Sequence, residues 1–322
     1  MPLFEQTIPI DKLTVAALVL KNWGIELDDI IKASQNHTFR AHDAQGARYS
    51  VRVTPDPSGK HLNRIKDELV FVNYVASAGL QHVCAPVAFQ DQQFVLATDS
   101  LVIVVFHWAK GAPVNFMSWR WMLDKAFVIA WGSFFGHLHV LSKKFTQDHP
   151  QVAHRIQRYD VIHDGVLAGV PLHEDDVRGE NDATQFGVIH GDLNCSNFYY
   201  VDGDTPMLSV FDWDQTMRSW YLYDLAQAIF GPIMLAEAGI PIIGTPVPQA
   251  NPTQYQAWLV AGYEAVSGPL TSAENVQLTR MVSLKRTFYE RFCRRALEEG
   301  DIPADMEAFI KYIVAWFDNN KE

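Results

Sequence analysis

The chain has 322 residues, of which 48% are hydrophobic and 20% are charged, and its formal net charge is −11. This length and this hydrophobic content suffice for two lobes with buried cores and argue against global disorder. An acidic chain repels phosphate backbones and anionic lipid, so we expect neither a nucleic-acid nor a membrane partner.

The sequence also lacks several common signals. Its three cysteines are scattered and form neither a disulfide framework nor a zinc pattern. The N-terminal residues do not resemble a secretory signal, and no run of about 18 apolar residues predicts a membrane helix. We therefore expect a cytoplasmic protein.

The first third of the chain predicts a small β-rich lobe. Residues 1–31 read as helical, with a shared apolar face formed by Leu13, Ala16, Ala17, Leu20 and Trp23. Strand-like runs follow, separated by turn residues, at 37–42, 47–53, 94–98 and 101–106. A further helix is predicted over residues 60–78, where Gly79 ends it.

One carboxylate in this lobe lies on the apolar face of a predicted helix. The helix predicted over 60–78 carries an apolar stripe of Leu62, Ile65, Leu69, Val72 and Val75, and Glu68 falls inside this stripe. Removing an unpaired charge from water costs roughly several kcal/mol, so Glu68 requires a buried partner.

The remainder of the chain predicts a larger helical lobe. Residues 121–141 are apolar nearly all round, which is typical of a buried central helix, whereas residues 150–183 are polar and irregular. Two helices broken at 300–303 are expected near the C-terminus. The layout predicts an α+β fold with a small antiparallel-sheet lobe over 1–106 and a larger helical lobe over 107–322. A cluster of basic residues is expected on a solvated helix face: Arg280, Lys285, Arg286, Arg291, Arg294 and Arg295.

The residues that carry chemistry are concentrated between 187 and 226. Residues 187–189 predict a short strand, followed by a loop in which His190, Asp192 and Asn197 have the spacing H-x-D-x-x-x-x-N. Two strand-like runs joined by the turn at 202–206 predict a hairpin, which should return Asp212 to the vicinity of Asn197.

These groups match the needs of phosphoryl transfer. The attacking hydroxyl needs a carboxylate that orients it and accepts its proton, a role that Asp192 can fill. Hard cations such as Mg²⁺ prefer oxygen ligands, commonly a carboxylate and an amide oxygen beside phosphates and water. Asn197 and Asp212 are therefore candidate metal ligands. Asp214 is either a second metal contact or a solvated loop residue.

The motif resembles the signature of the aminoglycoside phosphotransferase and choline kinase family, which has a protein-kinase-like two-lobe fold. The pattern H-G-D-L-x-x-x-N, a hairpin, D-W-D and D-L-A is matched by residues 190–193, Asn197, residues 212–214 and residues 224–226. The resemblance implies a small-molecule kinase that uses ATP and Mg²⁺, with His190 and Asp224 as supporting residues. Asp224 can accept backbone N–H hydrogen bonds from the catalytic loop.

The same resemblance implies nucleotide-binding residues in the first lobe. It suggests that Arg52 touches the nucleotide phosphates and that Glu68 is its helix partner. It also implies a phosphate-covering segment at 34–39 and an adenine-binding hinge at 105–108, with candidate contacts at Ser34, Asn36, Thr38, Val105 and His107. The chain departs from protein kinases in having arginine at position 52 instead of lysine, and the segment 34–39 contains no glycine.

Other readings of the sequence stay open. A bacterial-type protein Ser/Thr kinase would use the same groups, and a nucleotide-binding pseudokinase would explain Arg52 and the missing glycines. A metallohydrolase reading of the histidine and aspartates does not explain Arg52 and Glu68. For the acceptor, the acidic chain favours an amine-bearing alcohol, whereas the basic run at 280–295 would favour a carboxylate-bearing one.

Overall fold

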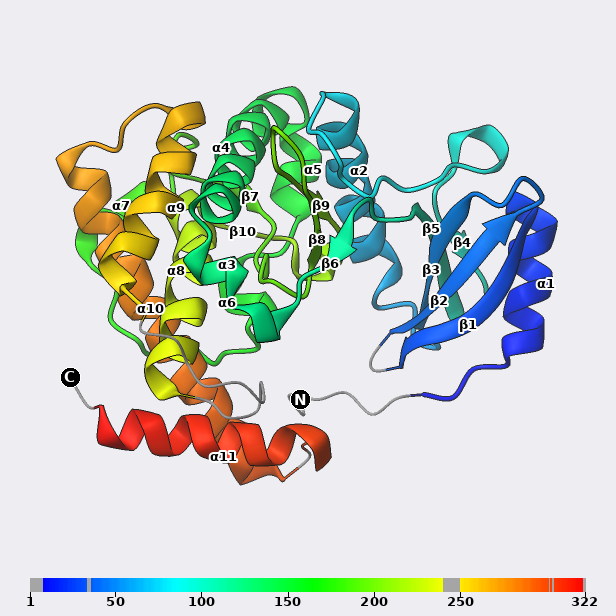
Figure 1. The fold of residues 1–322 in the computed structure, drawn as a ribbon. Helices are drawn as coiled ribbons and strands as arrows, with labels where there is room; N and C mark the ends of the chain where they lie inside the picture. The colour runs from blue at the N-terminus through cyan, green and yellow to red at the C-terminus, as the bar shows by residue number, and fades with distance from the viewer. Residues whose placement is uncertain (1–7, 34–35, 240–249, 301, 303, 321–322) are drawn as a thin grey trace. The chain divides into compact units, whose positions relative to one another are not determined.

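A computed structural model describes residues 8–33, 36–239, 250–300, 302 and 304–320. It divides into two compact units, one spanning Phe4–Ala109 and the other containing Lys110–Glu322. Figure 1 shows their elements. None of the helices in the described residues is long and apolar enough to span a membrane.

The first unit is built on one antiparallel sheet. Its strand order is β1-β2-β3-β5-β4, and the strands are β1 (Ile25–Ala33), β2 (His37–Asp43), β3 (Arg48–Pro55), β4 (Leu96–Ala97) and β5 (Leu101–His107). The helical elements are α1 (Lys12–Trp23), α2 (Leu62–Ser77) and the short 3-10 helix η1 (Gln90–Gln92). The β2–β3 hairpin and the helix predicted over 60–78 are both present.

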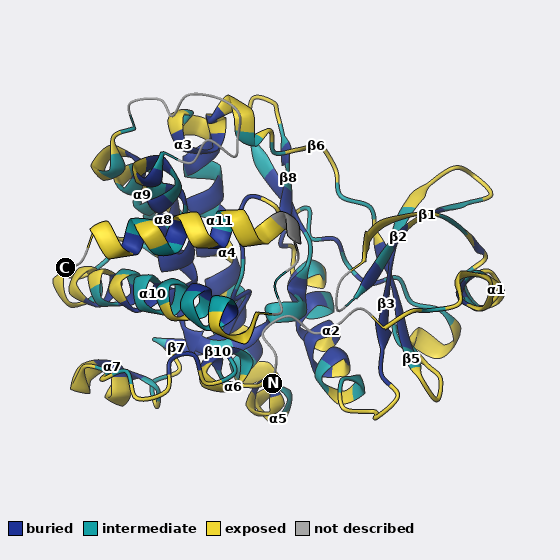
Figure 2. Cartoon of the chain, turned by 90° about the horizontal axis from the view of Figure 1, so that it is seen from below, coloured by how far each residue is buried: buried dark blue, intermediate teal, exposed yellow. Residues whose placement is uncertain are grey.

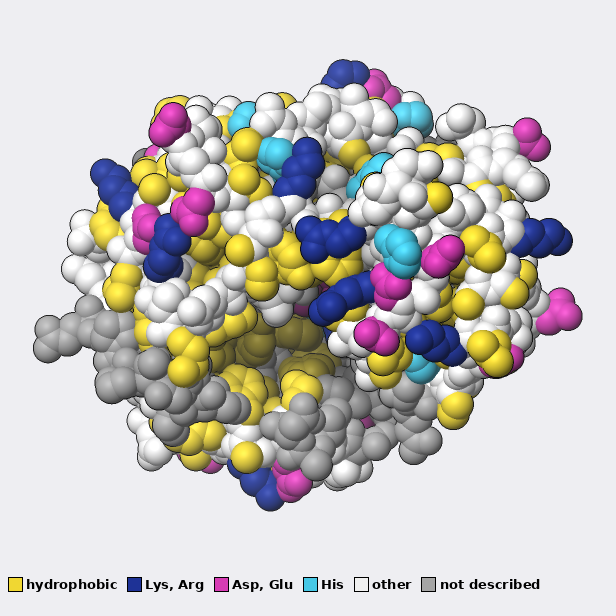
Figure 3. All heavy atoms as spheres, turned by 45° about the vertical axis from the view of Figure 1, so that its right-hand side comes forward, with side chains coloured by type: hydrophobic (Ala, Val, Ile, Leu, Met, Phe, Trp, Pro, Cys, Tyr) yellow, Lys and Arg dark blue, Asp and Glu magenta, His cyan; other side chains and the backbone are white. Residues whose placement is uncertain are grey.

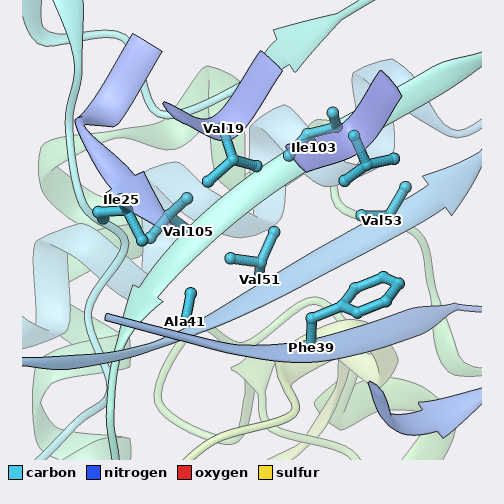
Figure 4. Packing of buried hydrophobic residues seen from close by; sticks show 9 residues of the cluster. Val19, Ile25, Phe39, Ala41, Val51, Val53, Ile103 and Val105 are labelled. Carbon is cyan, nitrogen blue, oxygen red and sulfur yellow. The ribbon is translucent and has the colours of Figure 1, made fainter. Parts of the chain in front are cut away.

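The alternating side chains of the central strands serve two cores. Ile103 and Val105 of β5 pack with Val51 and Val53 of β3 in a cluster that includes Val19 of α1 (Figure 4). The intervening β5 residues pack instead with α2, in a second cluster of Ile65, Leu69, Val102, Val104 and Phe106. Both faces of the sheet are therefore covered by helix, as the period of two in a strand allows.

The prediction of a helix over residues 1–31 is wrong for its second half. Helix α1 ends at Gly24, which adopts φ 69° and donates its N–H to the Leu20 carbonyl, and Ile25–Ala33 pair with β2. The predicted apolar face is also wrong, because Leu13 is 80% exposed while Val15 and Val19 are fully buried. Apolar residues occur on several sides of α1, so their spacing in the sequence did not show which side packs against the sheet.

The second unit is mainly helical. Its long helices are α4 (Lys125–Asp148), α8 (Tyr221–Ala238), α9 (Pro252–Ser267), α10 (Ser272–Glu299) and α11 (Ala304–Asn319). Residues 150–183, predicted to be irregular, contain three short helices: α5 (Pro150–Arg155), α6 (Tyr159–Ile162) and α7 (Glu174–Gly179). Buried residues occur along the whole of α8, which Figure 2 colours mostly dark blue.

Short strands complete this unit and carry the loops of interest. One sheet has the order β6-β8-β9, formed by β6 (Ala112–Pro113), β8 (Phe198–Val201) and β9 (Met207–Val210). The other pairs β7 (Phe186–Ile189) with β10 (Met217–Trp220). The remaining elements are η2 (Phe116–Ser118), α3 (Arg120–Leu123) and η3 (Trp213–Gln215).

Glycines let α4 and α9 approach closely. A Cβ atom built on Gly262 of α9 would lie 2.2 Å from the Ile129 carbonyl oxygen, and one on Gly132 of α4 would lie 1.9 Å from the Leu259 carbonyl oxygen. Real Cβ atoms do not tolerate such contacts with backbone, so both positions require glycine for this packing.

We predict that Gly262→Ala lowers the free energy of unfolding by about 1–3 kcal/mol, the usual cost of overpacking a tight contact. Urea denaturation measures this change. Gly231→Ala in α8 is the matched control, because an added Cβ there meets no atom within 4 Å. It should be neutral or stabilising by about 0.5–1 kcal/mol, as expected when alanine replaces glycine in a helix. Equal effects of the two substitutions would contradict the packing argument.

Candidate active site

The β8–β9 hairpin brings Asn197 and Asp212 together. Phe198 of β8 pairs with Val210 of β9, and the next residues continue the ladder, with the Phe211 N–H donating to the Asn197 carbonyl at 3.0 Å. Asp212 follows directly and has φ 63°, a left-handed conformation that is uncommon outside glycine. The predicted return of the chain is confirmed, and a backbone in such a sparsely populated conformation is often found at functional sites.

Gly191 shapes the loop that contains Asp192. It adopts φ 86°, and a Cβ atom there would lie 2.4 Å from the Gln215 carbonyl oxygen. Both the conformation and the close approach exclude larger residues. The loop therefore packs directly against the segment that follows Asp212.

Amide side chains surround the carboxylate of Asp192. Asn194 donates to its Oδ1 at 3.0 Å, Asn197 donates to its Oδ2 at 3.1 Å, and Gln227 donates to Oδ1 at 3.3 Å. Burial raises the pKa of Asp192, and the neighbouring Asp212 raises it further, while the Asn194 hydrogen bond and the charge of Lys285 act in the opposite direction. The result is an oriented carboxylate in a cluster of charges.

Asp224, at the start of α8, binds the backbone of the same loop. Its Oδ2 accepts the His190 backbone N–H at 3.0 Å, and its Oδ1 accepts the Gly191 N–H at 2.9 Å. These are the backbone hydrogen bonds expected from the sequence. Asp224 is fully buried. Burial favours the protonated form, but the hydrogen bond from His139 and those from the loop N–H groups outweigh it and lower the pKa of Asp224.

His139 was missed by the sequence reasoning. It lies on α4, is 1% exposed, and places Nε2 at 3.3 Å from Asp224 Oδ2, while Nδ1 lies 3.2 Å from the Tyr263 hydroxyl. Burial lowers the pKa of His139, so the neutral ring donates its Nε2–H to Asp224. His137, on the same helix, is exposed. Two histidines two residues apart give no signal in the sequence that one of them is buried beside Asp224.

His190 has a supporting position. Its ring nitrogens contact the backbone on both sides of the site: Nε2 lies 3.3 Å from the Phe211 carbonyl oxygen, and Nδ1 accepts the Asp192 N–H at 3.3 Å. The ring centroid is 4.5 Å from that of Trp213. His190 is fully buried. Asp214 lies in η3 and is half-buried.

The sequence reasoning placed Lys285 wrongly, on a solvated helix face. It is 1% exposed, and its Nζ lies 3.9 Å from the centroid of the Tyr223 ring. Burial lowers its pKa to about 8, although the carboxylates of Asp192 and Asp224 favour its charged form. Helix α10 therefore does not present all of its basic residues to solvent. Lys285 shares the stripe of Leu278 and Met281, the same signal that singled out Glu68.

The predicted nucleotide-binding residues lie in the first unit. Arg52 Nη2 donates to both carboxylate oxygens of Glu68, at 2.9 and 3.1 Å, and both side chains are buried. The predicted pairing of Arg52 with Glu68 is therefore present, and the guanidinium also lies over the Phe106 ring. Thr38 stands opposite Arg52 in the β2–β3 register.

The other candidate contacts are placed less uniformly. Asn36 Oδ1 accepts the Thr54 hydroxyl at 2.7 Å. The Val105 side chain is fully buried in the core beside α1, so only its backbone can meet a ligand. His107 is exposed at the end of β5. Ser34 lies outside the described residues.

The donor set fits a hard divalent cation. Among the residues that the structure describes, no group of three or more His, Cys, Asp and Glu side chains is arranged to hold a metal ion. A site that uses one carboxylate and one amide, completed by phosphate oxygens and water, needs no such group. The electrostatic repulsion between Asp212 and Asp192 is the feature that a cation would relieve.

Comparison with known proteins identifies the family. The model of the phosphotransferase enzyme family, APH, matches residues 30–266, which is most of the chain. The protein therefore belongs to this family, which confirms the resemblance drawn from the motif. A sequence comparison with curated proteins gives no match.

Solved structures confirm the fold class. Amicoumacin kinase hAmiN, in complex with AMP-PNP, Ca²⁺ and Ami, has a TM-score of 0.71 at 16% identity and covers 97% of this chain and 94% of its own. Spectinomycin phosphotransferase APH(9)-Ia, in complex with ADP and spectinomycin, has a TM-score of 0.62 at 12% identity, covering 97% and 96%. A microcompartment-associated aminopropanol kinase has 0.61 at 18% identity, covering 94% of each chain.

We predict that His139 makes the stability of the protein depend on pH. Below its ordinary pKa of 6.5, unfolded His139 takes up a proton that the buried ring resists, so stability is lost as the pH falls. The slope from this residue is at most about 1.4 kcal/mol per pH unit. His139→Gln, which keeps a donor for Asp224, should reduce the slope of unfolding free energy between pH 6.5 and 5.5.

Urea denaturation at several pH values measures this slope. His137→Gln is the matched control, because His137 is exposed on the same helix. An unchanged slope in His139→Gln would show that protonation of His139 does not limit stability in this range.

Proposed function

We propose that this protein is a kinase that transfers the γ-phosphate of ATP to a hydroxyl group of a small molecule, with Mg²⁺ as the metal. The observation that carries the proposal is the convergence of Asp192, Asn197 and Asp212 at the β8–β9 hairpin in a chain of the phosphotransferase family. A general base and two metal ligands are the groups that phosphoryl transfer needs from the protein.

Asp192 is proposed as the base. Its carboxylate is held by amide donors, and its backbone N–H donates to His190 Nδ1, so it can orient an acceptor hydroxyl and accept its proton. His190 and Asp224 are proposed as supporting residues, since both bind the loop and neither is exposed.

Asn197 and Asp212 would hold the metal ion, with Asp214 as a further contact from η3. When bound, Mg²⁺ would neutralise charge on the transferred phosphate. The Asn197 side-chain N–H donates to the Asp192 carbonyl oxygen at 2.7 Å, which directs the Asn197 side-chain oxygen away from that carbonyl. Two structural neighbours are complexes with AMP-PNP and with ADP, and the first also contains Ca²⁺, which supports a nucleotide and a divalent metal here.

The first lobe, residues 1–106, is proposed to bind the nucleotide, and residues 107–322 to carry catalysis and acceptor binding. Arg52 would touch the phosphates while Glu68 holds it in place, a rigid fork that replaces the lysine of protein kinases. The additional proposed contacts are Ser34, Asn36, Thr38, the Val105 backbone and His107.

An amine-bearing alcohol is the proposed acceptor. The net charge of −11 attracts cations, and one structural neighbour is named an aminopropanol kinase. The face in Figure 3 carries charge of both signs, with Lys and Arg side chains beside Asp and Glu side chains. On α10, the carboxylate of Glu290 forms an ion pair with Arg294 at 2.8 Å, so Glu290 is not proposed as the group that holds the amine.

The first test is a screen of alcohols and amino alcohols for ATP turnover, in Mg²⁺ and in EDTA. Asp192→Asn should lower kcat by about 10²–10⁴-fold, the usual contribution of a positioned base, while nucleotide binding persists. Calorimetry of ATP binding is the control for a folded protein. Near wild-type turnover in Asp192→Asn would remove Asp192 from the mechanism, and phosphorylation of proteins instead of small molecules would favour the protein-kinase alternative.

A second test concerns Arg52 and Glu68. Either single substitution to alanine should weaken ATP use, and the double variant should be hardly worse than Arg52→Ala, since contacting residues couple by about 0.5–3 kcal/mol. Strictly additive effects on kcat/KM for ATP would show that the two residues act separately. Asp176 and Arg280, an ion pair in the second unit whose carboxylate is buried, supply the control cycle. Their alanine variants should change stability and leave the KM for ATP intact.

A further inference from the structure

The two oxygens of the Asp192 carboxylate are bonded unequally. Oδ1 accepts from the Asn194 amide at 3.0 Å and from the Gln227 amide at 3.3 Å, whereas Oδ2 accepts from the Asn197 amide at 3.1 Å. A carboxylate oxygen has about two lone-pair sites. Counting donors from the described residues, both sites of Oδ1 are filled and one site of Oδ2 is left for another donor.

Gln227 is built into this position. It lies on α8, three residues after Asp224, and is 3% exposed. Its Nε2 also donates to the Tyr289 hydroxyl of α10 at 2.6 Å. Because a carboxylate only accepts hydrogen bonds, the nitrogen and not the oxygen of the amide must face Asp192. The amide therefore connects α10, through Tyr289, to one defined oxygen of Asp192.

We infer that Gln227 is a positioning residue, which acts with Asn194 to fix the rotation of the Asp192 carboxylate so that Oδ2 faces the acceptor hydroxyl. The inference rests on the proposed kinase function. In that reaction the acceptor O–H bond breaks and its proton passes to Oδ2. The acceptor oxygen forms a bond to the γ-phosphorus, and the bond from that phosphorus to the β–γ bridging oxygen breaks, with its electron pair leaving on ADP.

Each hydrogen bond to Oδ1 restricts the rotation of the Asp192 carboxylate, and Gln227 supplies one of these hydrogen bonds. Without Gln227, Oδ1 regains a lone-pair site and can compete with Oδ2 for the acceptor hydroxyl. A displacement of about 1 Å at a reacting group can cost about 10²-fold in rate. The loss should appear in kcat, since the orientation matters in proton transfer and not in binding of the nucleotide.

The test is Gln227→Met, which keeps the length of the side chain and removes its donors. We expect kcat to fall about 10–100-fold, with the Kd for ATP and the KM for the acceptor within about threefold of wild type. The kcat is expressed per nucleotide-binding site counted by calorimetry, so that loss of folded protein does not enter.

Gln277→Met is the matched control. Gln277 is also a buried glutamine, 5% exposed, and its Nε2 donates to a carboxylate oxygen of Asp176 at 3.1 Å. It should lose stability in the same way as Gln227→Met and keep wild-type kcat per site. A fall in kcat equal to that of Gln227→Met would show that the effect is structural and would overturn the inference.

Tyr289→Phe keeps the experiment decisive if Gln227→Met does not fold. Tyr289 is only half-buried, and the variant leaves Gln227 in place without its second partner. It should lower kcat by a smaller factor, again with the Kd for ATP unchanged. If the wild type phosphorylates an acceptor and the folded variants keep kcat within twofold of the wild-type value, the role of Gln227 is refuted and the proposed function is not. A wild type that phosphorylates no acceptor would refute the proposed function and this inference together.

Discussion

The hydrogen bonds of the buried Asp224 carboxylate are the interactions on which the loop that contains Asp192 depends. Removing a carboxylate from water costs several kcal/mol even after relaxation, so it persists only where donors replace the water. Here the donors are the backbone N–H groups of His190 and Gly191 and the ring of His139. One side chain thereby ties α8 and α4 to the loop and determines where Asp192 can lie.

The same physical solution appears in the first unit. Glu68 is buried on α2, and its two oxygens accept from the guanidinium of Arg52 on β3. A pair of this kind is weak evidence for stability, because well-packed apolar residues would often serve as well. Its value lies in holding a charged group in one orientation, which is what a nucleotide phosphate would require of Arg52.

Sequence reasoning succeeded where the signal was local. The H-x-D-x-x-x-x-N spacing, the turn at 202–206 and the strands around it predicted that Asn197 and Asp212 would meet, and Glu68 was found because it interrupts an apolar stripe. It failed for residues 25–33, whose strand character depends on pairing with β2. His139 and Gln227 were missed because their partners lie 85 and 35 residues away along the chain.

Lys285 changes how the charge of the site is understood. Three carboxylates, Asp192, Asp212 and Asp224, act on this centre, and Lys285 is a buried cation that interacts with two of them. With its pKa lowered to about 8, Lys285 keeps its charge at neutral pH and opposes the mutual repulsion of the carboxylates. A divalent cation held by Asn197 and Asp212, as proposed above, would act in the same direction. The buried ammonium and the proposed metal would therefore act on the same carboxylates. The ammonium is part of the protein, whereas the metal would come with the nucleotide, which brings negative charge of its own.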